Sequence, residues 1–293
     1  MKGEEKLWQI LNDKLETLRA GHRFPEAIRV ADRALQLARR IFAKNDLSLA
    51  LSYERLGQLY DEQGSRAEAK PCLTKALQIV EGAEPPEPRA VYRIARRLAN
   101  LCDVAGDEEE AIGYYEKAIA AGGQLETVAH SDLGTLLNNV ALIYRQGGRP
   151  EAAEAHYLHA LEIYEKQLGP NHPDVATVLN NLGVFYTNER RVTEAEQMHR
   201  RALAIRKEAH PNGSADIAQS NCNLAVVYHT RGDYARAGEL YRESLGAWEE
   251  LSGAPPEDYE IGASNYADLL RSLGKRRKAA SIVSRARKKR RRM

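Results

Sequence analysis

A period of 42 residues runs through almost the whole chain and constrains its fold more than any other feature. The clearest unit places Leu182, Gly183 and Tyr186 on one segment and Ala195 and Ala202 on the next. Steps of 42 in either direction reach equivalent apolar, small or aromatic residues without an insertion. Repeats of about 20 to 50 residues form arrays in which each unit buries its apolar face against its neighbours. The approximate units are 8–49, 50–91, 92–133, 134–175, 176–217, 218–259 and 260–287.

The spacing inside each unit predicts two antiparallel helices. A large, a small and usually an aromatic residue mark the first segment, and small, large and small residues at i, i+4 and i+7 mark the second. Each spacing gives a helix one apolar stripe, and the small residues let the two helices approach closely. In five units a glycine stands between the segments, where a helix end requires a positive φ angle. These glycines are Gly64, Gly106, Gly148, Gly232 and Gly274.

This arrangement resembles the tetratricopeptide repeat, whose usual unit has 34 residues. We assign the additional residues to a longer second helix and to a loop such as LGPNHPDVA at 168–176, where Pro173 and Asp174 open the next helix. Units 4 to 6 are most similar to the 42-residue repeats of kinesin light chains. The resemblance implies an all-α, right-handed superhelical solenoid of seven antiparallel helix-turn-helix hairpins over 1–287. It also implies a non-catalytic scaffold that binds a peptide in a concave groove.

An asparagine recurs at one register of the first helix in four successive units. Asparagine is a poor helix former, so its recurrence suggests a use other than folding. An amide can both donate and accept a hydrogen bond, and the resemblance implies that this register clamps the backbone of an extended peptide. Alternatively, the amides cap helices, bridge neighbouring helices, or are inherited solvated residues. The candidates are Asn139, Asn181, Asn223 and Asn265, with Asn138 and Asn180 beside two of them.

Arginines gather on the same predicted face in units 3 and 4. Guanidinium groups bind carboxylates through paired hydrogen bonds, so these residues predict a partner segment with acidic residues. The alternative is a solvated arginine face paired with Asp103 or with neighbouring glutamates, and Glu54 would repel an acidic ligand beyond unit 3. The candidates are Arg93, Arg96, Arg97 and Arg145, together with Asn100.

The chain contains no constellation typical of an enzyme or a metal site. It has no phosphate-binding glycine loop, nucleophile elbow, zinc signature or calcium loop. Cys72, Cys102 and Cys222 are isolated, so we interpret them as small buried residues. We therefore expect neither catalysis, nor a cofactor, nor a bound metal.

Charge is distributed unevenly along the chain. Residues 271–293 hold twelve Lys or Arg and no Asp or Glu, whereas residues 1–270 hold 31 basic and 41 acidic residues. The basic tail at 288–293 could cap the array, act as a targeting signal, or bind nucleic acid or an anionic surface. An alternative function is therefore that of a nucleic-acid-associated or peptide-sensing regulatory protein acting through this tail. The charged N-terminus and the lack of a long apolar run predict a cytoplasmic location and no transmembrane segment.

Overall fold

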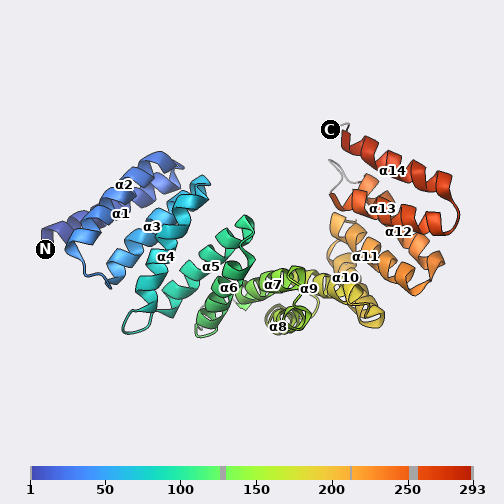
Figure 1. Ribbon diagram of the computed structural model, residues 1–293, viewed down its shortest axis with the longest axis horizontal. Helices are drawn as coiled ribbons and strands as arrows, with labels where there is room; N and C mark the ends of the chain where they lie inside the picture. The colour runs from blue at the N-terminus through green and yellow to red at the C-terminus, as the bar shows by residue number, and fades with distance from the viewer. Residues whose placement is uncertain (1, 126–129, 212, 251–256, 292–293) are drawn as a thin grey trace. The chain divides into compact units, whose positions relative to one another are not determined.

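The computed structural model describes residues 2–125, 130–211, 213–250 and 257–291. This part of the chain forms fourteen helices and no strand, which confirms the all-α hairpin architecture (Figure 1). Odd-numbered helices are the first helix of each hairpin and even-numbered helices the second. The first seven are α1 (Lys2–Ala20), α2 (Phe24–Ile41), α3 (Leu47–Gln63), α4 (Arg66–Glu81), α5 (Pro88–Ala105), α6 (Glu108–Gly122) and α7 (His130–Gln146). The others are α8 (Pro150–Leu168), α9 (Pro173–Asn188), α10 (Val192–Ala209), α11 (Ala215–Arg231), α12 (Tyr234–Glu250), α13 (Glu257–Ser272) and α14 (Arg276–Arg291).

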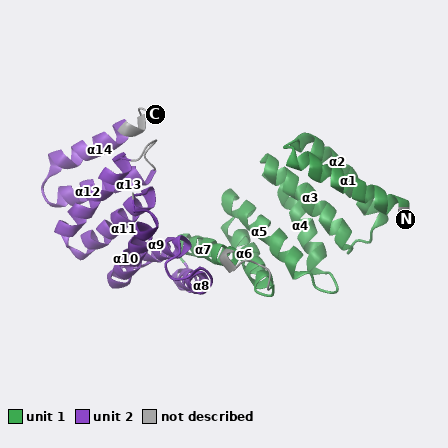
Figure 2. Cartoon of the chain, turned by 180° about the vertical axis from the view of Figure 1, so that it is seen from behind, with its two compact units in different colours: residues 1–148 green, residues 149–293 purple. Residues whose placement is uncertain are grey.

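The helices divide into two compact units, residues 1–148 and residues 149–293 (Figure 2). In each unit, helices that follow one another in the chain pack together, as α5 does with α6 and α9 with α10. In the second unit, α11 also contacts α9 and α13, so the first helices of successive repeats are neighbours. One continuous array over 1–287 and its right-handed twist both stay predictions.

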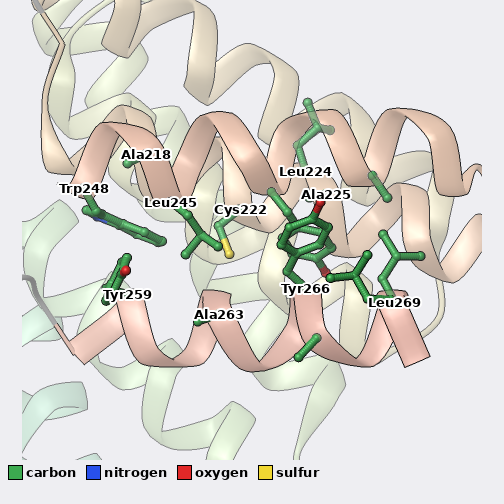
Figure 3. Packing of buried hydrophobic residues seen from close by; sticks show 14 of the residues in the cluster. Ala218, Cys222, Leu224, Ala225, Leu245, Trp248, Tyr259, Ala263, Tyr266 and Leu269 are labelled. Carbon is green, nitrogen blue, oxygen red and sulfur yellow. The ribbon is translucent and has the colours of Figure 1, made fainter. Parts of the chain in front are cut away.

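Small residues at the predicted register allow the helices of each hairpin to pack closely. Seven alanines spaced by 42 residues lie on the second helices, and every one is fully buried. A larger side chain at this register would force apart helices that pack at about 8 to 10 Å. Figure 3 shows how the resulting core is filled in repeats 6 and 7, where Trp248 packs edge-on against Tyr259. The seven alanines are Ala27, Ala69, Ala111, Ala153, Ala195, Ala237 and Ala279.

The turn between the two helices of a hairpin requires left-handed backbone in all seven repeats. The five predicted glycines all have positive φ, between 69° and 88°. Repeats 1 and 5 have no glycine there, yet His22 and Arg190 occupy the same register with φ of 55° and 59°. The sequence pattern predicted the glycine turns but did not single out these two positions, because neither residue is a glycine.

The ends of the elements follow the local chemistry. α9 begins at Pro173, as predicted, and the His172 side chain accepts a hydrogen bond from the backbone N–H of Asp174 at 3.2 Å. At the other end of the chain, α14 continues through Arg291, so the basic run begins inside a helix. Leu245 is buried in repeat 6, whereas its counterpart Arg287 is exposed in repeat 7. This exchange makes α14 more polar than the equivalent helix of repeat 6.

We expect Arg190→Gly to stabilise the second unit by about 1 kcal/mol, because glycine removes the strain of a side chain at positive φ. Gly106→Ala is the reverse change and should destabilise the first unit by a similar amount, because it places a side chain at positive φ. A methyl group there would meet no atom within 4 Å, so backbone strain alone is measured. Urea denaturation of the full chain measures both effects. A lower midpoint for Arg190→Gly would contradict the strain argument.

Candidate functional site

The four recurring asparagines lie in the interior of α7, α9, α11 and α13, and each is half-buried. Asn181, Asn223 and Asn265 belong to the second unit, where α11 contacts both α9 and α13. These three amides therefore occupy the same register on neighbouring helices. Asn139 occupies this register on α7 of the first unit.

Asn180 is a structural residue that links two repeats. Its side chain is only 6% exposed, and its Oδ1 accepts a hydrogen bond from Nδ2 of Asn223 at 2.9 Å. This bond crosses from α11 to α9 and agrees with the bridging alternative. Asn223 retains its own Oδ1 and its second N–H, because an amide has two donors and one acceptor oxygen.

Asn100 and Asn139 both contact the hydroxyl of Tyr115, which is fully buried on α6. The hydroxyl lies 2.9 Å from Oδ1 of Asn100 and 3.1 Å from a carboxylate oxygen of Asp103. The Asn139 side chain also hydrogen bonds to it, from α7. Burial raises the pKa of Tyr115, so the hydroxyl stays protonated and can donate. These contacts tie α5, α6 and α7 together.

Two of the predicted arginines already have carboxylate partners inside the first unit. Arg93 and Glu54 form a bidentate pair with Nη2 and Oε2 2.7 Å apart, and the Glu54 side chain is only 5% exposed. The hydrogen bond from this pair raises the pKa of Arg93. Arg97 lies with Nη1 3.6 Å from Oδ2 of Asp61. Internal pairing agrees with the alternative interpretation for these two residues, although the partners differ from Asp103.

The other two arginines form no ion pair with a carboxylate of the described residues. The Arg96 guanidinium lies 5.8 Å from the ring centre of Tyr92 on α5. Arg145 is half-buried near the end of α7, as is Asn138 in the middle of the same helix. Arg96 and Arg145 are therefore the guanidinium groups of this face whose charge is not balanced by a described carboxylate.

Asn221 is a polar residue that the sequence pattern did not single out. It is 5% exposed, and its Oδ1 has no hydrogen-bond partner among the described residues. The equivalent residues one and two repeats earlier are Leu179 and Leu137, both buried. An amide in place of a core leucine is a visible departure from the repeat and could have been found by aligning the units.

His199 is a further buried polar residue of the second unit, at a register where Tyr115 stands two repeats earlier. It is 1% exposed, and its imidazole hydrogen bonds to the backbone of Gly183. A methyl group added at Gly183 would lie 2.6 Å from the ring, so the glycine makes room for the histidine. Burial, followed by the charge of Arg206, lowers the pKa of His199 to about 4. The ring is therefore neutral at pH 7.

The described residues contain no cluster of three or more His, Cys, Asp or Glu side chains that could hold a metal ion. Cys102 and Cys222 are buried and Cys72 is half-buried, and all three are free thiols. None of the described helices combines the length and apolarity that a membrane span needs.

Comparison with known proteins agrees with this architecture. A family model described as tetratricopeptide repeat matches residues 10–82, 132–208 and 216–292, and a second one of the same description matches residues 54–126. The crystal structure of BtubC (BKLC) from P. vanneervenii is similar, with 30% sequence identity and a TM-score of 0.59 over 80% of this chain and 95% of that one. A search among curated proteins finds no match to the sequence.

Two further structures share the fold at lower identity. One is a kinesin light chain with TPR-like repeats from Podosopora anserina, with 19% identity and a TM-score of 0.54 over 69% of this chain and 96% of that one. The other is the apo form of the quorum sensor NprR from B. thuringiensis, with 14% identity and a TM-score of 0.59 over 98% and 76%.

The hairpins, their period and their alanine contacts define a helical repeat protein. The chain belongs to the tetratricopeptide repeat family, and its structural neighbours include kinesin light chain-like members. Proteins of this family generally mediate protein–protein interactions and are typically non-enzymatic.

We expect the stability of the protein to fall between pH 6.5 and pH 4 because of His199. Its folded pKa of about 4 lies below the ordinary histidine value of 6.5, so acid protonates the unfolded chain first and favours unfolding. Above pH 6.5 the His199 imidazole is neutral in both the folded and the unfolded chain, so its contribution to stability is constant. At pH 4 the decrease in the free energy of unfolding approaches about 3 kcal/mol, because each unit of pKa shift contributes about 1.36 kcal/mol.

His199→Leu is the matched variant, since Leu73 faces Gly57 at the equivalent register. Urea denaturation at pH 7, 5.5 and 4 should show a smaller acid loss in this variant than in the wild type. Equal slopes in the two proteins would show that His199 is not the titrating group.

Proposed function

We propose that this chain is a non-catalytic protein-interaction scaffold that binds an extended segment of a partner along the first helices of its repeats. The observation that carries the proposal is the amide register of α7, α9, α11 and α13, which places four half-buried asparagines inside helices. Half-burial fixes a side chain while leaving part of it accessible, and a fixed amide loses little freedom when it binds a peptide backbone.

The polar contacts around the amides support this assignment in the second unit. Asn223 is held by Asn180, which orients its amide and leaves one oxygen and one N–H for a ligand. A peptide backbone offers the complementary carbonyl and N–H at every residue other than proline. Binding through the backbone would accept many partner sequences, so selectivity requires other residues.

We assign the selectivity for acidic partners to Arg96 and Arg145 of the first unit. Arg93 and Arg97 are balanced by Glu54 and Asp61, so they would have to exchange partners before contacting a ligand. Arg96 and Arg145 have no described carboxylate partner to give up. An acidic partner segment would therefore gain most from contacts with these two residues.

We expect the variant Asn139→Ala/Asn181→Ala/Asn223→Ala/Asn265→Ala to lose partner binding by about tenfold or more, because the backbone of the partner would lose its hydrogen-bond partners. Affinity capture with the full chain, followed by mass spectrometry, measures the loss for each protein recovered by the wild type. Circular dichroism and thermal denaturation verify the fold, since Asn139 and Asn223 also make internal contacts.

A matched control changes exposed residues on the second helices instead, as in Gln197→Ala/Glu243→Gln/Ser281→Ala. This control should capture the same partners as the wild type. Undiminished capture by a folded amide variant would refute the role of the amide register.

We further expect Arg96→Gln/Arg145→Gln to weaken binding of the captured partner and to reduce the dependence of its affinity on salt. Opposite charges across an interface are screened by salt, so removing two of them flattens this dependence. A titration of the partner at three salt concentrations measures the effect. Arg33→Gln/Arg66→Gln, which removes two exposed charges from α2 and α4, should bind as the wild type does. The same loss in both variants would indicate only a general effect of charge.

A further inference from the structure

A polar clamp fastens successive repeats in the second unit. Between repeats 5 and 6, the hydroxyl of Tyr228 on α11 donates to Glu196 on α10 at 2.9 Å. Arg231 also pairs with Glu196, at 2.9 Å, and Arg200 contacts both the hydroxyl and the carboxylate. The previous junction repeats the arrangement with Tyr186, which donates to Glu154 at 2.8 Å.

The clamp is missing between repeats 6 and 7. A step of 42 residues replaces Glu196 with Gly238, Tyr228 with Leu270 and Arg231 with Leu273. These three residues therefore provide neither a carboxylate, nor a hydroxyl, nor a guanidinium group. In place of the clamp lies an open cavity of about 520 Å³ between α12, α13 and the start of α14.

Packing does not require the glycine at this point. A methyl group added at Gly238 would have one neighbour within 4 Å, a Leu269 methyl group at the ordinary contact distance of 3.9 Å. Glycine inside a helix is less favourable than alanine by about 1 kcal/mol. The residue thus keeps the cavity open at some expense of helix stability.

The cavity combines an apolar floor with a cationic rim. Buried Leu269, Leu270 and Tyr266 form the floor, and Tyr266 and Leu269 lie together at one end of the cluster in Figure 3. Tyr234 and Leu273 line it as well, and their side chains are exposed, at 43% and 41%. Such a combination of exposed apolar surface and concavity is typical of a binding site.

The charges around the cavity indicate the partner that would fit. Arg242, Lys275 and Lys278 line it, with Glu239 as the single carboxylate among the lining residues. Lys275 and Lys278 form no ion pair within the described part of the chain, and Nε of Arg242 donates to the backbone oxygen of Gly238. An occupant with negative charge beside an apolar group would satisfy both the floor and the rim.

We propose that this cavity is a second binding site, which receives a bulky apolar side chain flanked by acidic residues in a segment of a partner protein. None of its lining residues belongs to the amide register, so the site does not depend on the groove proposed above. The apolar side chain occupies the space that the Tyr–Glu pair fills in the two preceding junctions. The flanking carboxylates meet the three cations of the rim.

The test uses the full chain and three capped pentapeptides with the central sequences Asp-Trp-Asp, Lys-Trp-Lys and Asp-Ala-Asp. We expect the wild type to bind Asp-Trp-Asp about tenfold more tightly than either of the others. Methyl NMR spectra should show shifts at Leu269, Leu270 and Leu273. Comparable binding of Lys-Trp-Lys, or shifts confined to methyl groups near the amide register, such as Val184 and Val226, would overturn the proposal.

Gly238→Glu/Leu270→Tyr restores the residues that the repeat itself uses at the preceding junction. The variant should fill the cavity, reduce the affinity for Asp-Trp-Asp by about tenfold or more and keep the melting temperature at or above that of the wild type. A stable variant with unchanged affinity would refute the assigned site.

A second variant tests the rim without altering the interior. Lys275→Gln/Lys278→Gln changes two exposed residues and should remove most of the preference for Asp-Trp-Asp over Lys-Trp-Lys. Retention of the full preference would contradict the role of the rim. Gln197→Ala/Ser281→Ala, which changes exposed residues outside both proposed sites, should bind Asp-Trp-Asp as the wild type does.

Discussion

The close contact between the two helices of each hairpin is the constraint on which the rest of the structure depends. At its centre lies an alanine that is fully buried in every repeat, from Ala27 to Ala279. Two helices can approach to about 8 to 10 Å only where small side chains face each other. Gly57 and Gly183 show how strict this is, since an added methyl group would lie 2.7 Å from Leu73 in one case and 2.6 Å from His199 in the other. The buried alanine is therefore the same in every repeat, whereas the larger residue of the second helix varies, as Leu73 and His199 show.

The steric part of the structure was predictable from the sequence because it repeats. Seven hairpins, the buried alanines and five glycine turns all follow from residue size or backbone freedom at a fixed register. His22 and Arg190 were not predictable, because a non-glycine residue takes a positive φ only when the surrounding turn imposes it. The family pattern predicted the turn, whereas these side chains gave no local signal of it.

The partners of the polar residues were much harder to predict. Asn180, Asn100 and Arg93 lie at registers that the sequence correctly placed on helices, yet each contacts a neighbour that the period does not specify. A hydrogen bond depends on the rotamers of both side chains, and the period places a residue on a helix face without fixing its rotamer. The structure therefore separates the arginines into paired residues, Arg93 and Arg97, and residues without a described carboxylate partner, Arg96 and Arg145. It also shows that Asn223 makes a structural contact through one N–H of its amide.

At a few positions the chain departs from its own repeat pattern, and these positions hold features that the pattern does not predict. Asn221 replaces a core leucine, His199 occupies a register where Tyr115 and Tyr241 stand, and Gly238 replaces a clamping glutamate. For His199, the neighbouring Gly183 compensates the change by making room for the ring. For Gly238, no neighbour fills the space, and the residues that would have completed the clamp have become leucines. A change that packing compensates is explained by folding alone. At Gly238 the chain instead leaves an open, charged cavity where it elsewhere places a tyrosine and a glutamate, and the proposed second binding site rests on this difference.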